Sequence, residues 1–173
     1  ERKKAEEALR YTAEKFALAF NQSPSPMCIN SFPEGRYVDA NDAYLHALGC
    51  KREDLIGHTP ADLGLWIDKS EPRAFLKQLY KTGAANNFEL RVRDQHGKIH
   101  WGLHSALIIN ISNSPFILTQ IMDITDSKEA IEKLTQAQIF NEELINSVPG
   151  ILYLYDHTGH LVWWNKMHEA LTG

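Results

Sequence analysis

The sequence repeats part of itself, and this repeat constrains the fold more than any other feature. A shift of 124 residues aligns the chain with itself without a gap, and the matches fall at positions with backbone roles. They include a turn glycine, a strand valine and a helix-capping asparagine: Gly35 with Gly159, Val38 with Val162, and Asn41 with Asn165. Such self-similarity indicates copies of one structural unit. We therefore expect one complete domain that ends near residue 125 and the start of a second domain after it.

Periodicity and breaker residues divide the chain into four segments. Residues 1–22 are predicted to form an amphipathic linker helix, and residues 23–125 a complete domain. Residues 126–146 are predicted to form a second linker helix, and residues 147–173 the truncated start of the second repeat. The second helix has coiled-coil spacing with polar residues at two seam positions. It is compatible both with a solvated single helix and with a switchable parallel dimer.

Within residues 23–125, strand patterns occur at both ends and short helices lie between them. The expected strands are 27–31, 36–40, 88–93, 99–111 and 116–125, and the expected helices are 42–48, 51–56 and 71–82. This order predicts an α+β domain with one five-stranded antiparallel sheet. Its short helices would lie on one face, and long linker helices would flank the domain at both ends.

Composition excludes several kinds of partner. Of the 173 residues 43% are apolar and 23% are charged, as in soluble globular domains. The net charge of −4 gives no reason to expect a nucleic acid partner. No apolar run is long enough to span a bilayer, so we expect no direct membrane contact from this fragment. The two cysteines, Cys28 and Cys50, do not suggest a disulfide scaffold and favour a cytoplasmic location.

Several short motifs carry a family resemblance through their order and spacing. They are Ser23-Pro24-Ser25-Pro26-Met27, Val38-Asp39-Ala40-Asn41, Arg52-Glu53-Asp54-Leu55-Ile56-Gly57, Asn87-Phe88-Glu89-Leu90-Arg91, Gly97 with Trp101, and Asp123-Ile124-Thr125. With them, residues 12–126 resemble a PAS domain of bacterial and archaeal sensory proteins, and residues 136–173 resemble the first part of another. The resemblance implies the PAS fold, in which the sheet cups a small pocket under the helices.

The resemblance also implies a function. PAS modules bind a small ligand or cofactor, or dimerise, and pass a signal along helices to an output domain. The expected role is a cytoplasmic sensor module in a two-component signalling protein, with neighbouring PAS domains and a histidine kinase as output. A diguanylate cyclase output and a ligand-free dimerisation spacer are the alternatives. No nucleophile motif, phosphate loop or carboxylate pair stands out, so the fragment itself is not expected to be an enzyme.

The pocket face follows from a more specific similarity. The flavin-binding LOV branch also places a tryptophan four residues after the turn glycine, and this suggests that Trp101 faces outward. The expected pocket residues are then Met27, Ile29, Leu45, Phe75, Leu90, Val92, His104, Thr119 and Ile121. His104 and Thr119 are the polar groups expected to meet a ligand. The alternative is a core histidine bonded to Thr119 or to the backbone.

The residues that hold flavin or haem in the branches of the family that bind them are missing from this sequence. The LOV branch carries a reactive cysteine after the position of Gly57, where this chain has residues 58–63 without a cysteine. The haem-binding branch places its histidine on the helix that corresponds to residues 71–82, which contain none. His100 and His104, four residues apart on a strand, would be separated by about 13 Å and cannot share a metal. We expect an empty pocket or an unknown small organic ligand, and no metal site.

Both faces of the last two strands are apolar, so something should cover the outer face. Either the helix of residues 1–22 or a partner subunit could do this. We expect a homodimer formed through that helix and the outer sheet face. The residues expected at this interface are Phe16, Trp101, Leu103 and Met122.

The tripeptide Asp123-Ile124-Thr125 lies where the last strand ends and the second linker helix begins. Asp123 places a carboxylate at the end of a buried strand, and Thr125 has a hydroxyl that can cap the helix. We expect Asp123 and Thr125 to couple the domain to that helix.

Overall fold

The computed structural model describes residues 2–68 and 70–172, which divide into two compact units between Thr125 and Asp126. The first unit begins with α1 (Arg2–Asn21) and contains one five-stranded sheet. Its strands are β1 (Met27–Ser31), β2 (Tyr37–Ala40), β3 (Ala84–Arg93), β4 (Ile99–Ile111) and β5 (Ser114–Asp123). They pair antiparallel in the order β2-β1-β5-β4-β3, which confirms the predicted α+β fold.

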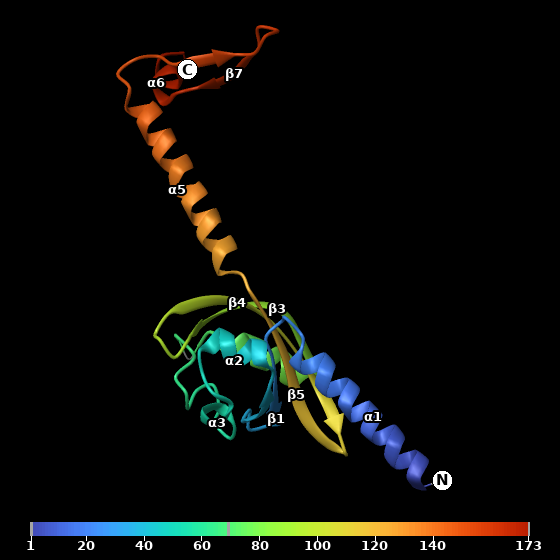
Figure 1. The fold of residues 1–173 in the computed structure, drawn as a ribbon. Helices are drawn as coiled ribbons and strands as arrows, with labels where there is room; N and C mark the ends of the chain where they lie inside the picture. The colour runs from blue at the N-terminus through green and yellow to red at the C-terminus, as the bar shows by residue number, and fades with distance from the viewer. Residues whose placement is uncertain (1, 69, 173) are drawn as a thin grey trace. The chain divides into compact units, whose positions relative to one another are not determined.

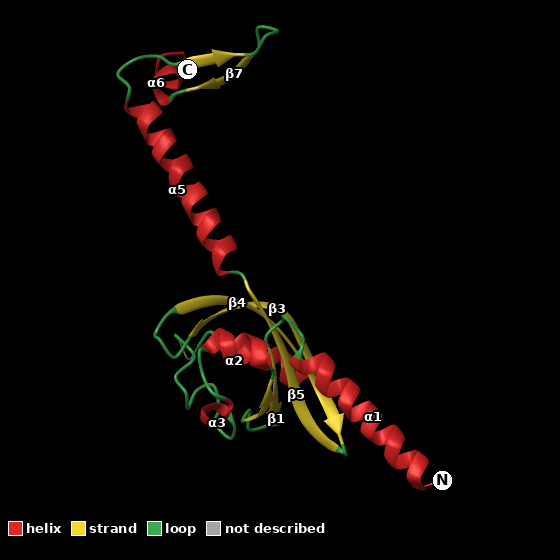
Figure 2. Cartoon of the chain, in the orientation of Figure 1, coloured by secondary structure: helices red, strands yellow, loops and turns green. Residues whose placement is uncertain are grey.

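Three helices connect the two halves of the sheet. They are α2 (Asp42–Leu48), α3 (Arg52–Leu55) and α4 (Pro72–Thr82). Figure 1 shows α2 and α3 on the concave side of the curved sheet, and Figure 2 shows the loops that join them. Gly49 ends α2 with φ of 67°, a left-handed conformation that glycine adopts without steric cost. α2 and α3 therefore lie against one face of the sheet.

β3 is longer than its alternation predicts. The alternating pattern begins at Phe88, whereas the strand begins at Ala84. Its pairing with β4 is irregular between Ala85 and Phe88, where Asn87 has φ of 60° and donates its backbone N–H to Ser105 Oγ at 3.1 Å. A bulge of this kind interrupts the two-residue period, so the first part of the strand was not visible in the sequence.

The buried apolar residues form two clusters instead of one. The first joins β1, β2 and α2 through residues such as Cys28, Tyr37 and Tyr44. The second joins α4 to β3, β4 and β5 through residues such as Phe75, Leu79, Ala85, Leu90, Ala106 and Ile117. A domain of this size usually has one contiguous core. The division indicates that the space between the two clusters is not filled by packed side chains.

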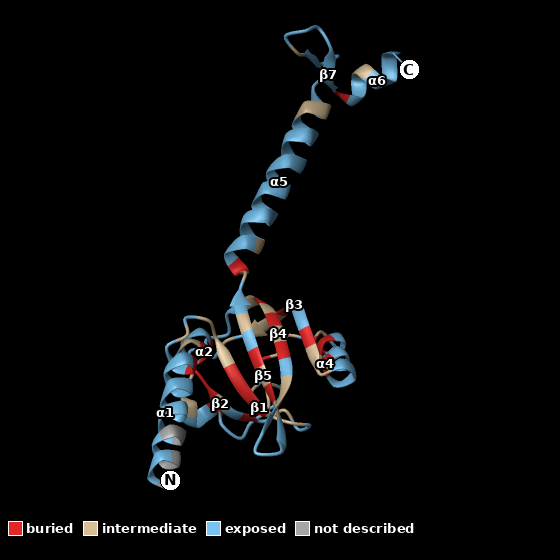
Figure 3. Cartoon of the chain, turned by 90° about the vertical axis from the view of Figure 1, so that its right-hand side faces the viewer, coloured by how far each residue is buried: buried red, intermediate tan, exposed pale blue. Residues whose placement is uncertain are grey.

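α1 does not cover the outer face of the sheet. Every side chain from Arg10 to Ala19 is exposed, whereas Phe20 near the end of the helix is 4% exposed (Figure 3). Of the two predicted covers for the outer face, the chain's own helix is therefore excluded. None of the helices in the described residues is long and apolar enough to cross a membrane.

The second unit contains α5 (Thr125–Ser147), β6 (Tyr153–Tyr155), β7 (Leu161–Trp164) and α6 (Lys166–Thr172). Its hairpin repeats β1 and β2, and the pairing irregularity of Ile29/Asn30 recurs at Leu154/Tyr155. The repeat is not free of gaps, however. Cys28 pairs with Ala40 as Tyr153 pairs with Trp164, so the first strand is offset by 125 residues and the second by 124. The connecting loop is one residue shorter in the second copy.

The second hairpin leaves large apolar side chains uncovered. Leu154 and Val162 are 58% and 51% exposed, and Tyr153 and Trp164 are 56% and 41% exposed. Exposed aromatic groups of this kind normally pack on another part of a structure.

Candidate functional site

A cavity of about 270 Å³ separates the two core clusters of the first unit. Cys28, Tyr37 and Tyr44 border it from the first cluster, and Phe75 and Ile117 border it from the second. Its walls are mostly apolar. The cavity explains why the core is divided, and it lies where a family pocket was expected.

The predicted pocket residues divide into two groups. Phe75, Val92, His104, Thr119 and Ile121 border the cavity. Met27, Ile29, Leu45 and Leu90 lie outside its lining, so their predicted placement was wrong. That any of these residues binds a ligand stays a prediction.

The errors have a clear geometric reason. Successive residues of a strand face opposite sides of the sheet, and Cys28 pairs with Thr119 in the neighbouring strand. Cys28 and Asn30 therefore face the cavity, and Met27 and Ile29 face away. On α2 the cavity is bordered by Tyr44 and Leu48 instead of Leu45, while Leu90 packs within the second cluster.

Most polar groups in the cavity wall already have partners. The hydroxyls of Tyr37 and Tyr44 are 2.6 Å apart and hydrogen-bond to each other. The Cys28 thiol donates to Asn30 Oδ1 at 3.4 Å, and Asn30 Nδ2 donates to Gly35 O at 3.1 Å. Burial raises the pKa of Cys28 to about 12, so its thiol stays protonated. No pattern in the sequence singles out these residues, because only the folded chain brings them together.

His104 differs from these groups. It is 3% exposed, and the rings of Trp66 and Phe75 lie with centroids 6.2 Å from its own. Within the described residues, its Nε2 is the one buried side-chain N or O atom without a hydrogen-bond partner. Burial lowers the pKa of His104 to about 4, so the imidazole is neutral at physiological pH. The alternative prediction was a core histidine that hydrogen-bonds to Thr119. Nε2 of His104 does not make that bond.

The glycine beside His104 makes room for its ring. A Cβ added at Gly102 would lie 2.6 Å from Nε2 of His104 and 2.9 Å from Ile121 Cγ2. Gly102 and His104 lie on the same face of β4, two residues apart. The lack of a side chain at residue 102 therefore lets the Nε2–Cδ2 edge of the imidazole lie close to the strand.

Hydrogen bonds join the end of β5 to β4. Ile124 N–H donates to Trp101 O at 2.8 Å, and Trp101 N–H donates to Thr125 Oγ1 at 2.9 Å. Asp123 Oδ1 accepts from Thr125 N–H at 2.8 Å and from the Thr125 hydroxyl at 2.5 Å. We call Asp123, Thr125 and Trp101, with His100 described next, the strand-end network. The first residue of α5, Thr125, is thus held to β4 by its side chain.

His100 connects this network to the β3–β4 turn. Its Nδ1 lies 3.4 Å from Asp123 Oδ2, and its Nε2 lies 3.1 Å from Asp94 Oδ2. Partial burial raises the pKa of Asp123, but the hydrogen bonds from Thr125 and the nearby His100 outweigh it and leave that pKa below its usual value. No group of three or more His, Cys, Asp or Glu side chains in the described residues is placed to hold a metal ion.

A second cavity of about 40 Å³ lies beside the first. Tyr44, Leu48, Val92 and Ile121 border both cavities. The smaller cavity also reaches Gly102 and the strand-end residues His100, Trp101 and Asp123. The wall between the two cavities therefore connects the main cavity to the strand-end network.

The predicted dimer residues lie at the surface. Met122 is 58% exposed and Phe16 is 54% exposed, while Trp101 and Leu103 are half-buried. The Arg91 guanidinium lies 5.6 Å from the Trp101 ring centroid and is paired with Glu71. That these residues form a dimer interface stays a prediction.

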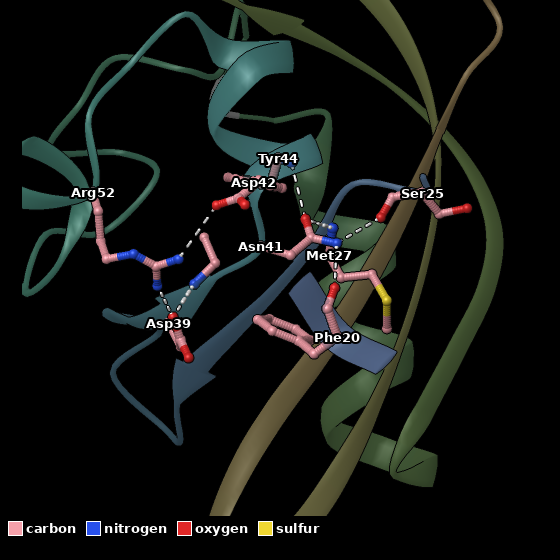
Figure 4. A network of polar contacts seen from close by, with 9 residues as sticks. Phe20, Ser25, Met27, Asp39, Asn41, Asp42, Tyr44 and Arg52 are labelled. Carbon is pink, nitrogen blue, oxygen red and sulfur yellow. Dashed lines mark hydrogen bonds and ion pairs between the residues drawn. The ribbon is translucent and has the colours of Figure 1, made fainter. Parts of the chain in front are cut away.

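Asn41 joins the N-terminal helix to the domain (Figure 4). It is fully buried, and its Oδ1 accepts from Met27 N–H and Tyr44 N–H, both at 2.9 Å. Its Nδ2 donates to Phe20 O at 3.0 Å and to Ser25 O at 2.9 Å. One amide thus holds the end of α1, the start of β1 and the first turn of α2.

Comparisons with known proteins agree with this architecture. A family model described as PAS fold matches residues 20–129. The PAS domain of an HTR-like protein from Haloarcula marismortui is 18% identical with a TM-score of 0.56, and covers 70% of this chain and 99% of its own. A PAS domain from a two-component sensor histidine kinase is 14% identical with a TM-score of 0.54, covering 68% and 98%. A Rhodobacter sphaeroides LOV protein is 18% identical with a TM-score of 0.56, covering 66% and 68%. At these identities the solved structures show a shared fold.

Proposed function

The chain belongs to the PAS family, and from this premise we propose that residues 23–125 sense a small organic ligand in the main cavity. The ligand signal passes through Asp123 and Thr125 to α5 and then to an output domain. The observation that carries this proposal is the wall that the main cavity shares with the cavity at the strand-end network. The corresponding general role, a sensory and signalling domain, is that of the PAS family.

Two features of the cavity support a ligand. An apolar core normally packs to crystal-like density with few voids, so a divided core needs a reason. The wall is mostly apolar and carries a few polar groups, as ligand pockets usually do. A bound molecule would fill the space between the two core clusters.

The relay has a physical requirement. A ligand shifts an equilibrium only if it binds two arrangements of the protein with different affinity. Ile121 borders both cavities and lies two residues before Asp123 on β5. A ligand that moves Ile121 would therefore change the position of Asp123 and its bonds to Thr125.

For the whole protein we propose a cytoplasmic sensor histidine kinase of a two-component system with a further PAS domain after α5. The repeat of the β1–β2 hairpin in β6 and β7 supports the further domain. A diguanylate cyclase output is the alternative. We do not propose flavin or haem, because the residues that hold them in the resembling branches have no counterpart here.

A ligand-free dimerisation spacer is the second candidate function. It is favoured by the exposed apolar side chains of α1 and of the outer sheet face, Phe16 and Met122 among them. Removal of residues 1–22 is then expected to convert a dimer to a monomer, as measured by light scattering after gel filtration. A chain that is monomeric before the deletion, or dimeric after it, would argue against this interface.

We expect Asp123→Ala to separate the two parts of the proposed function. The variant should keep residues 23–125 folded, because Asp123 is more than half exposed and lies at the end of β5. It should lose the response of α5 to ligand. The measurement is amide hydrogen exchange of residues 126–147 in the 173-residue chain, before and after removal of any co-purified molecule identified by native mass spectrometry.

The neighbouring acidic residue provides the matched control. Asp126 is exposed in the first turn of α5, so Asp126→Ala should retain the response. If α5 of the unmodified chain exchanges equally with and without the molecule, the relay is wrong. If Asp123→Ala unfolds the first unit, Asp123 has a structural role and the relay through it is not supported.

A further inference from the structure

The wall of the main cavity carries almost no charge. Among the described residues that border it, Glu34 is the one with a formal charge at neutral pH, and this residue is exposed. Burial raises the pKa of the Cys28 thiol to about 12 and lowers the pKa of the His104 imidazole to about 4, so both groups are neutral. A cation or an anion enclosed there would lose its hydration without gaining a partner of opposite charge from the described wall.

The polar atoms of the wall are mostly bonded to one another. Its two tyrosine hydroxyls form a mutual hydrogen bond, and the Cys28 thiol donates to Asn30, which donates to the carbonyl oxygen of Gly35. Nε2 of His104 is buried beside Gly102 on β4, so it gives the cavity no open position. A strongly polar ligand would lose hydrogen bonds to water that this wall does not replace. The cavity therefore favours a mainly apolar molecule.

Size and wall chemistry favour a ring system. An engineered apolar cavity of about 150 Å³ holds benzene, so about 270 Å³ accommodates one or two rings. Aromatic molecules pair favourably with aromatic side chains in edge-to-face or offset arrangements. Side chains of this kind border the cavity on several sides, and they are Tyr37, Tyr44, Trp66, Phe75 and Tyr80.

The exposed edge of the wall disfavours anions as well. Glu34 lies in the turn between β1 and β2 and borders the cavity, so its carboxylate lies where the cavity meets the surface. A carboxylate or phosphate group left at this edge would meet a charge of the same sign. An ammonium group left there would gain little, because exposed ion pairs are weak. Neither kind of ion therefore gains from the edge what it loses inside.

We propose that the main cavity binds an uncharged, mainly apolar molecule of one or two rings and excludes ring compounds that carry a charge. This inference rests on the proposed sensory function and adds the chemical class of the ligand. Burial of apolar surface and ring contacts supply the binding free energy. No single atom of the wall has to recognise a polar group of the ligand.

The test uses the 173-residue chain, freed of any co-purified molecule, and three one-ring probes of nearly equal size. Ethylbenzene is uncharged, benzoate is an anion and benzylammonium is a cation. We expect ethylbenzene to bind at least about tenfold more tightly than either ion, because each ion would bring its charge to a wall without a partner for it. Titrations followed through the methyl resonances of Ile117, Thr119 and Ile121, which border the cavity, give the three affinities.

Two neighbouring residues of β5 provide a matched pair of variants. Thr119 borders the cavity, so Thr119→Phe should place a ring in it and weaken ethylbenzene binding at least about tenfold. Gln120→Phe should leave binding unchanged, because Gln120 is exposed and faces the opposite side of the sheet. If Thr119→Phe does not fold, nuclear Overhauser contacts from ethylbenzene to the methyl groups of Ile117 and Thr119 in the unmodified chain decide the location. Unchanged binding in Thr119→Phe, or contacts confined to residues outside the wall, would overturn the assignment to this cavity.

Failure of this ligand class is distinguishable from failure of the proposed function. Benzoate or benzylammonium bound as tightly as ethylbenzene would refute the class, and so would absence of binding by all three probes. Tighter binding of benzylammonium that Glu34→Gln abolishes would refute it in favour of a cationic ligand. A charged co-purified molecule in the cavity would refute the class and leave the sensory function standing. The exchange response of α5 to the co-purified molecule decides the sensory function, and it does not depend on these probes.

Discussion

Replacing Asn41 with alanine is expected to lower the free energy of unfolding of the first unit by about 3 to 5 kcal/mol. The side chain is fully buried and makes four hydrogen bonds to backbone groups of three segments (Figure 4). Alanine removes the cap of α2, which costs about 1 kcal/mol. It also leaves Met27 N–H and the carbonyl oxygens of Phe20 and Ser25 without this partner, at about 1 kcal/mol or more for each group that water cannot reach.

The measurement is urea unfolding of the 173-residue chain, followed through NMR resonances of residues 23–125. Asp42→Ala is the matched control, since Asp42 is the exposed next residue and should change stability by less than about 0.5 kcal/mol. Asn165→Ala is a second control that removes the equivalent cap from the second unit. It should disorder the β6–β7 hairpin without shifting the midpoint of the first unit. A loss below about 1 kcal/mol for Asn41→Ala would show that the surrounding backbone finds other partners.

The fold could be predicted because its signals are local. The helix-ending glycines, the asparagine cap and the alternation of β3 from Phe88 onward each specify a short stretch of backbone without reference to the rest of the chain. The repeat then placed the domain boundary near residue 125, where the structure divides. The one-residue gap in the repeat was missed. Gly35 and Asn41 both keep the offset of 124 residues from their copies, and only the first strand is shifted to 125.

The cavity wall could be predicted only in part. On β4 and β5, the outward position of Trp101 decided which alternate residues should face the cavity. His104, Thr119 and Ile121, which were placed in this way, do border it. On β1 the more apolar face, with Met27 and Ile29, points away from the cavity, because the pairing of Cys28 with Thr119 decides which face is inward. That register is set by strand pairing in the assembled sheet, and the sequence of a five-residue strand does not determine it.

His100 shows a second limit of the sequence. Its distance from His104 excluded a shared metal, and nothing in the sequence paired it with a carboxylate. Gly102 lies opposite Asp123, and this register brings His100 within 3.4 Å of that carboxylate. The turn that begins at Asp94 supplies the second carboxylate, at 3.1 Å. Contacts between strand ends of this kind follow from the sheet register and become visible only with the structure.

Lowering the pH from about 6.5 to about 4 is expected to cost the first unit about 3 kcal/mol of stability through His104 alone. Burial lowers the pKa of His104 from 6.5 in the unfolded chain to about 4 in the folded one. Between these values the unfolded chain binds a proton that the folded chain does not bind. The free energy of unfolding therefore falls as the pH falls through this window, and it stops falling through this residue once the folded imidazole is protonated.

Two measurements separate His104 from other acid effects. Asp94 and Asp123 have pKa values below the usual 3.8, so they lose their native partners mainly below the His104 window. Urea unfolding between pH 7 and pH 4 should therefore show a slope that His104→Phe flattens. If that variant does not fold, an NMR titration of the His104 imidazole in the unmodified chain decides the matter. A titration near pH 6.5 would mean that water reaches the imidazole, and the expected loss of stability would not occur.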